Sequence, residues 1–129
     1  MMSWQTLLAI GSGGFIGAIS RAYLNGLISH RVPHDLPFGT LGVNLLGSFI
    51  MGLLVSYFMY TTLFSVHLKS FLTTGILGAL TTYSTFAIES FLLLQGGSIF
   101  LALANISLNV FGTIFMAGSG FYIVKNIME

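Results

Sequence analysis

A run of five hydroxyl residues stands out in this sequence: Thr81, Thr82, Tyr83, Ser84 and Thr85. They lie at the middle of an apolar stretch from about residue 70 to residue 94. A regular helix would turn some of these hydroxyls toward apolar surroundings, and the threonines together with Gly75 and Gly78 weaken a helix here. We therefore predict a break in the helix, where free carbonyls could hold a cation. The alternative is a regular helix whose hydroxyls bond the carbonyls four residues earlier.

Tyr83 and Phe86 are three residues apart and would share one face of a helix. Aromatic residues in such a segment usually serve packing alone. Beside a polar break, however, the electropositive edge of a ring can contact an anion without supplying a full positive charge. This arrangement suits an anion that must leave quickly, because a full charge would bind it too tightly.

Two further polar tracks follow helical spacing. Their members recur every four residues: Thr40, Asn44 and Ser48 in one, and Asn105, Asn109 and Thr113 in the other. Each set would line one ridge of its helix. A single membrane asparagine often only joins helices, at about 1 kcal/mol. Two matching tracks favour a polar pathway, although a purely structural role remains the alternative.

Two charged residues fall inside apolar stretches, Arg21 and Glu89. A charge at the centre of a membrane helix costs about 2.5–3.5 kcal/mol, so such residues are candidates for function. Glu89 follows the aromatic pair by about one turn, whereas Arg21 lies nearer a helix end and could extend to the interface. Both could stand at the mouth of a pathway; alternatively, Glu89 pairs with Arg21 or is satisfied by backbone groups.

The composition identifies the class of protein. The 129 residues include four Lys or Arg and three Asp or Glu, and 55% are hydrophobic, with a mean hydropathy of +0.95. Because soluble domains carry about 25% charged residues, a charged fraction of 5% excludes a soluble protein. A net charge of +1 excludes an electrostatic nucleic-acid binder, and the absence of cysteine excludes disulfides and thiolate chemistry.

We predict one all-α integral membrane domain over residues 1–129, with spans at about 4–29, 38–63, 70–94 and 99–124. Residues 14–18 resemble 75–79, and 44–48 resemble 109–113, which suggests a duplicated hairpin. Lys and Arg are almost evenly divided between the two sides. The chain therefore has either a weak orientation set by other signals or two opposite orientations.

The residue types and the number of spans also exclude several classes of function. No nucleophile–base pair, metal cluster or phosphate loop is present, so we expect no enzyme activity. Small dimeric four-helix multidrug or cation antiporters have this length, but they need a carboxylate in the first span, which has none. A passive channel needs only a lined path. Four helices can hardly enclose and shield a pore alone, so we expect an oligomer, most simply an antiparallel homodimer.

Four motifs occur in order, one in each span: GFIGAISR at 14–21, PFGTLGVNLLGSF at 37–49, GILGALTTYSTF at 75–86 and NISLNVFGT at 105–113. With these motifs the chain resembles the bacterial fluoride channel family (Fluc, also called CrcB). The resemblance implies a multi-pass protein of the bacterial inner membrane, which forms a dual-topology antiparallel homodimer. Two pores would export fluoride passively, and a structural Na⁺ would lie at the dimer centre.

The resemblance also implies roles for individual residues. The carbonyls of Gly78 and Thr81 would hold Na⁺, and Arg21 would lie at the vestibule. The fluoride pore would be lined by Asn44, Tyr83, Ser84, Thr85, Phe86, Glu89, Asn105, Asn109 and Thr113. Tyr83 departs from the family pattern, which usually has phenylalanine there. Its hydroxyl adds a hydrogen-bond donor and changes access to the pore.

Overall fold

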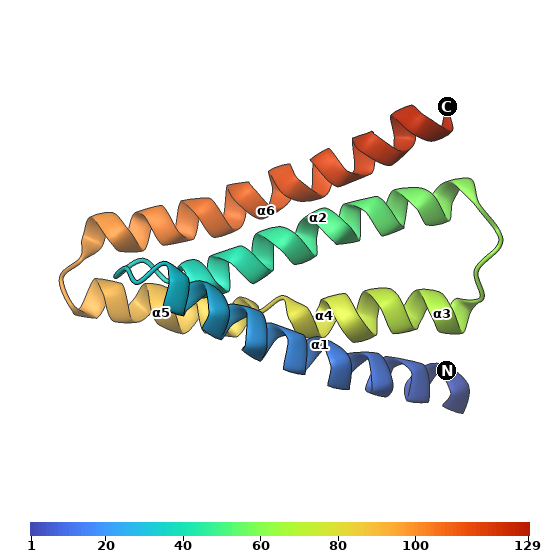
Figure 1. Ribbon diagram of the computed structural model, residues 1–129, viewed down its shortest axis with the longest axis horizontal. Coiled ribbons are helices and arrows are strands. Elements are labelled where there is room, and N and C mark those ends of the chain that lie inside the picture. Colours follow the sequence, from blue (N-terminus) through green and yellow to red (C-terminus); the bar gives the residue numbers. More distant parts are fainter.

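The computed structural model describes all residues, 1–129, as a bundle of helices. Four long helical segments run alongside one another and are joined by short links (Figure 1). Each is long and apolar enough to cross a membrane, which confirms the predicted number of spans. Both termini and the link between the second and third segments lie at the same end of the bundle (Figure 1).

The first, second and fourth segments are single helices: α1 (Trp4–Arg31), α2 (Phe38–Tyr60) and α6 (Ile99–Met128). The third segment, Val66–Gln95, has four parts: α3 (Val66–Ser70), the π-helix η1 (Phe71–Leu77), α4 (Gly78–Leu80) and α5 (Tyr83–Gln95). Two residues between α4 and α5 are not helical, so the predicted break near the middle of this segment is confirmed.

The helix ends differ from the predicted boundaries by a few residues, for local reasons. The third segment starts at Val66 rather than at 70, because the Ser65 hydroxyl accepts the Leu68 amide (3.2 Å) and caps the helix. The last helix continues to Met128 rather than ending near 124. Between α5 and α6 the chain turns at Gly97, whose φ of 82° is readily adopted only by glycine.

The repeated motifs face each other in the bundle. α2 and α6 lie side by side and run in the same direction, as do α1 and the first half of the third segment (Figure 1). Asn44 bonds Asn109, its counterpart in the repeat. Where α1 packs against η1, a Cβ on Gly13 would lie 3.0 Å from the Gly75 Cα, so only glycine lets the two backbones come this close.

The interior of the bundle is more polar than that of a soluble protein. Its largest fully buried side chains are Val43, Asn105, Thr40 and Ser56. Large apolar residues, such as Phe15, Phe111 and Phe115, are instead exposed on the outside. Because lipid is as apolar as these side chains, the arrangement fits a membrane protein whose helices associate through small and polar residues.

Candidate functional site

The break in the third segment is formed by two residues with extended backbone. Thr81 has φ and ψ of −82° and 153°, and Thr82 has −146° and 116°. The Thr82 hydroxyl accepts the Thr85 amide (3.3 Å) and so starts α5. The Thr81 hydroxyl donates to the Leu77 carbonyl (3.1 Å), four residues earlier. Back-bonding, the predicted alternative to a break, therefore occurs beside the break.

Asn44 of α2 satisfies the opened backbone. The Thr82 amide donates to Asn44 Oδ1 (2.7 Å), and Asn44 Nδ2 donates to the Thr82 carbonyl (3.1 Å). The two residues thus exchange a pair of hydrogen bonds in place of those that a continuous helix would make. Buried backbone groups need such partners, and lipid offers none.

From Asn44 a chain of buried hydrogen bonds continues to α6 and returns to α5. Asn44 Nδ2 donates to Asn109 Oδ1 (2.9 Å), and Asn109 Nδ2 donates to Asn105 at its carbonyl (2.9 Å) and Oδ1 (3.0 Å). Asn105 Nδ2 donates to the Ser90 hydroxyl (2.9 Å), which donates to the Phe86 carbonyl (2.8 Å). Sequence reasoning missed Ser90, although its position four residues after Phe86 marks the inner ridge of α5.

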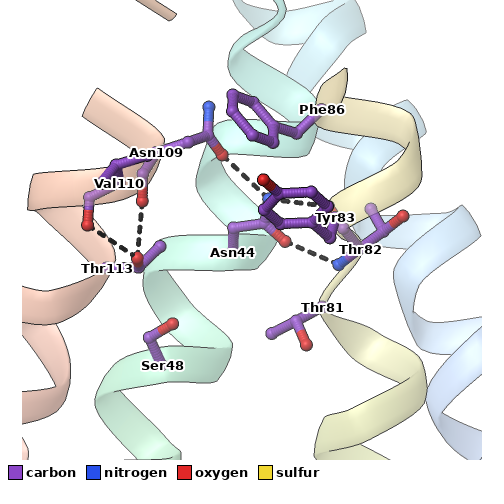
Figure 2. A pocket seen from close by; sticks show the side chains of 9 residues that line it. All are labelled: Asn44, Ser48, Thr81, Thr82, Tyr83, Phe86, Asn109, Val110 and Thr113. Carbon is purple, nitrogen blue, oxygen red and sulfur yellow. Dashed lines mark hydrogen bonds between the residues drawn. The ribbon is translucent and has the colours of Figure 1, made fainter. Parts of the chain in front are cut away.

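A cavity of about 200 Å³ opens beside this network (Figure 2). Nine residues line it: Asn44, Ser48, Thr81, Thr82, Tyr83, Phe86, Asn109, Val110 and Thr113. They come from α2, the broken third segment and α6, and none of them carries a formal charge. The cavity therefore offers amide and hydroxyl groups and aromatic rings, all of them neutral.

The rings of the two aromatic residues pack edge to face. The centroids of the Tyr83 and Phe86 rings are 5.3 Å apart, with an interplanar angle of 74°, so an edge of one faces the other ring. Phe86 is 6% exposed, whereas Tyr83 is 79% exposed at the rim. The shared face expected from their spacing is present, but one ring is buried and the other is open to the surroundings of the chain.

The break also brings two helix ends together. The carbonyl end of α4 lies at Leu80, and the amide end of α5 starts at Tyr83. No backbone amide donates to the Thr81 carbonyl, and the Thr82 amide bonds Asn44 instead of the Gly78 carbonyl. Oxygen atoms free in this way suit a hard cation. The amide end of α5, by contrast, favours an anion.

Four of the predicted pore residues lie outside the cavity. Ser84 is exposed, and the Thr85 hydroxyl accepts from that of Thr82 (2.9 Å). Asn105 lies fully buried behind Asn109. Glu89 lines a separate cavity of about 450 Å³ that also includes Asp35.

The two intramembrane charges do not pair. Glu89 Oε1 accepts the Thr40 hydroxyl (2.7 Å), and Thr40 in turn accepts from Asn25 Nδ2 (3.3 Å). The one ion pair in the structure joins Lys125 to Glu129 (4.0 Å), so the alternative of a Glu89–Arg21 pair is wrong. Arg21 is partly exposed on α1. Asn25 was not among the predicted residues, because a lone asparagine in a helix carries no spacing signal.

Comparison with known proteins agrees with the sequence motifs. The family described as CrcB-like protein, Camphor Resistance (CrcB), matches residues 8–121. A protein of Sulfurimonas denitrificans named fluoride-specific ion channel FluC is 78% identical over 124 residues, 96% of each chain. Proteins of the same name from Nautilia profundicola and Campylobacter jejuni are 50% and 52% identical; the alignments cover 99% and 94% of this chain and 100% and 98% of theirs. This four-helix, multi-pass membrane chain belongs to the CrcB family.

Proposed function

We propose that this chain forms a fluoride-selective channel through which fluoride leaves the cytoplasm passively, across the inner membrane of a bacterium. The observation that carries the proposal is the uncharged cavity at the helix break, lined by amides, hydroxyls and two aromatic rings. Such groups can replace the water around a small anion without the tight binding that a fixed charge would cause. The names of the relatives support the same substrate.

The channel is an antiparallel homodimer with two pores. In a single chain Tyr83 is 79% exposed at the rim, so one side of a polar cavity would face lipid. A second copy would cover that side and complete the path. The nearly even distribution of Lys and Arg supports insertion in both orientations, which an antiparallel pair requires.

A structural Na⁺ would lie where the broken third segments of the two subunits meet. The carbonyls of Gly78 and Thr81, which receive no hydrogen bond across the break, fit this ion and would hold it from both subunits. The ion would supply positive charge near the centre of the dimer, and the residues around it would stay neutral. Asn44 keeps the break open by bonding the Thr82 amide and carbonyl.

Fluoride passes along the polar tracks of α2 and α6. Asn44, Asn109 and Thr113 line the cavity, with the edges of Tyr83 and Phe86 opposite. Outside it, Thr40 and Glu89 continue the polar line along α2 and α5, and Arg21 contributes positive charge at the vestibule. Larger halides are excluded because hydrogen bonds hold Asn44, Asn109 and Thr113 in the wall, so that the path cannot widen around a larger ion.

The proposal is tested by measuring efflux from liposomes that contain the purified protein, with fluoride and chloride electrodes. We expect rapid loss of fluoride with the membrane potential clamped, no loss of chloride, and no dependence on a proton gradient. Chloride leaving as fast as fluoride would contradict the selectivity. Efflux driven by protons would instead favour the antiporter alternative. Tags on either terminus should be accessible from both sides of the membrane; one orientation only would exclude the antiparallel dimer.

A further inference from the structure

A line of hydrogen bonds reaches Glu89 from α1. The Ser29 hydroxyl donates to Asn25 Oδ1 (3.2 Å), and Asn25 Nδ2 donates to the Thr40 hydroxyl oxygen (3.3 Å). Thr40 in turn donates to Glu89 Oε1 (2.7 Å). The three bonds run in one direction and end on the only acidic side chain within the four membrane-spanning segments. The line therefore joins α1, α2 and α5 at a single carboxylate.

The Thr40 hydroxyl differs from other hydroxyls of the bundle in where its hydrogen goes. Thr73 and Ser90 each donate to the backbone carbonyl four residues earlier. Thr40 lies in the first turn of α2 and donates instead to a side chain of another segment. Because the Asn25 amide nitrogen offers hydrogens only, the single hydrogen of this hydroxyl goes to Glu89.

The line is built into the packing of α1 against α2. Thr40 is 1% exposed, so a second copy of the chain has no access to either of its bonds. Gly39, beside it, is also buried. A Cβ on Gly39 would clash with the carbonyl and Oδ1 of Asn25 and lie 2.5 Å from the Ser29 hydroxyl, so only glycine leaves room for the amide. The contact thus belongs to one chain and does not depend on its state of association.

The position of Glu89 depends on this line. Its Oε1 atom accepts the Thr40 hydrogen, while its Oε2 atom is buried without a hydrogen-bond partner, so one bond holds the side chain. The side chain also borders the cavity of about 450 Å³, which gives it room to change rotamer. In the proposed path a displaced carboxylate would repel a passing anion, most strongly where water is scarce.

We propose that Asn25 and Ser29 are positioning residues for fluoride passage, which direct the Thr40 hydroxyl to Glu89 and so hold this carboxylate against α2. The inference rests on the proposed function. Neither residue lines the cavity at the helix break, and neither makes a hydrogen bond to Glu89, so each acts through Thr40. Without the Asn25 amide the Thr40 hydroxyl is free to turn, and the carboxylate is released into the path.

The first test measures how accessible Glu89 is, and it needs no ion flow. The full-length protein in liposomes is treated with a hydrophobic carbodiimide, which reacts with carboxyl groups, and modification of Glu89 is followed by mass spectrometry. Asn25→Leu keeps the size of the side chain but removes its donors. It should raise the initial rate of modification about tenfold, the lower value for losing one hydrogen bond to a charged group. Asp35, exposed in the link before α2, should react at an unchanged rate.

Further variants reach the same bond without altering Asn25. Ser29→Ala removes the bond that fixes the amide, and Gly39→Ala displaces the amide with its added methyl group. Both should raise the modification of Glu89, whereas Ser29→Thr keeps the hydroxyl and should leave it low. In Thr40→Val protein, which has no hydroxyl to direct, Asn25→Leu should add no further rise.

The second test measures fluoride efflux from the same liposomes. Asn25→Leu should slow its initial rate about tenfold, because the released carboxylate lies in the path. The matched control is Asn126→Leu, since Asn126 is exposed on α6 and makes no side-chain hydrogen bond. It should change neither the efflux nor the modification of Glu89. Size-exclusion chromatography should give the same elution volume for all variants.

The two readouts separate the inference from the proposed function. If Asn25→Leu leaves the modification of Glu89 unchanged, or raises it further in Thr40→Val protein, Asn25 does not act through Thr40 and the inference is wrong. It is also wrong if Glu89 becomes accessible while fluoride efflux stays the same. If the unchanged protein passes no fluoride, the proposed function fails, and the carbodiimide reaction still decides whether Asn25 holds Glu89 in place.

Discussion

Replacing Asn44 by leucine tests whether one side chain holds the helix break. The two side chains are similar in size, so the change removes hydrogen bonds more than volume. Three bonds disappear: Thr82 N to Oδ1 (2.7 Å), Nδ2 to the Thr82 carbonyl (3.1 Å) and Nδ2 to Asn109 Oδ1 (2.9 Å). The Thr82 amide and carbonyl then lie buried without partners.

The size of the effect follows from measured polar contacts in membrane proteins. These average about 0.6 kcal/mol each and reach about 1.7 kcal/mol, so three of them correspond to a loss of roughly 2–5 kcal/mol in the free energy of unfolding. We expect the upper half of this range, because Thr82 is buried and its backbone has no helical neighbour to bond instead.

The assay is equilibrium unfolding of the purified protein in mixed micelles, followed by circular dichroism. Asn126→Leu is the matched control, since Asn126 is exposed on α6 and makes no side-chain hydrogen bond; it should change stability by less than about 0.5 kcal/mol. A double-mutant cycle with Asn109→Leu should give a coupling of at least about 0.5 kcal/mol. A loss below about 1 kcal/mol for Asn44→Leu would refute the reasoning and show that the break is stable without this residue.

Three further predictions concern the aromatic wall, the helix packing and the cation. Phe86→Ile should slow fluoride efflux at least tenfold while the dimer stays intact, because it removes the ring edge; unchanged efflux would mean that Phe86 only packs. Gly52→Ala should destabilise the protein by about 1–3 kcal/mol, since a Cβ there would clash with the Ala117 carbonyl, whereas Gly118→Ala, with nothing within 4 Å, should be neutral or slightly stabilising in the same unfolding assay. Exhaustive dialysis into sodium-free buffer should lower both the thermal stability and the fluoride efflux, and returning Na⁺ should restore them; indifference of both would exclude a structural sodium ion.

Much of the fold could be predicted because the signals are strong and local. Long uncharged stretches identify membrane spans by length alone. The break at Thr81 and Thr82 could also be located, since five hydroxyls in a row cannot all face the protein in a regular helix. The π-helix at Phe71–Leu77 could not be predicted, because it depends on how α1 packs against this part of the third segment.

The candidate site could be predicted only in part. Spacing identified the polar tracks, and Asn44, Asn109 and Thr113 do line one cavity. Spacing did not separate them from Asn105, which lies behind Asn109, because a helix ridge is longer than the stretch that borders the cavity. Ser84 and Thr85, which the family resemblance placed in the pore, also lie outside the cavity. For Glu89 the sequence suggests a pair with Arg21 or satisfaction by backbone groups, but its partner is the neutral side chain of Thr40 of α2.

The sequence by itself determined the class of protein, the four spans, the place of the break and, through its motifs, the family. These properties depend on composition and on residues near one another in the chain. Only the tertiary structure decided which polar groups are used within the protein and which stay free. Asn44 finds its partners at Thr82 and Asn109, 38 and 65 residues away, so its hydrogens are committed only once three helices pack together.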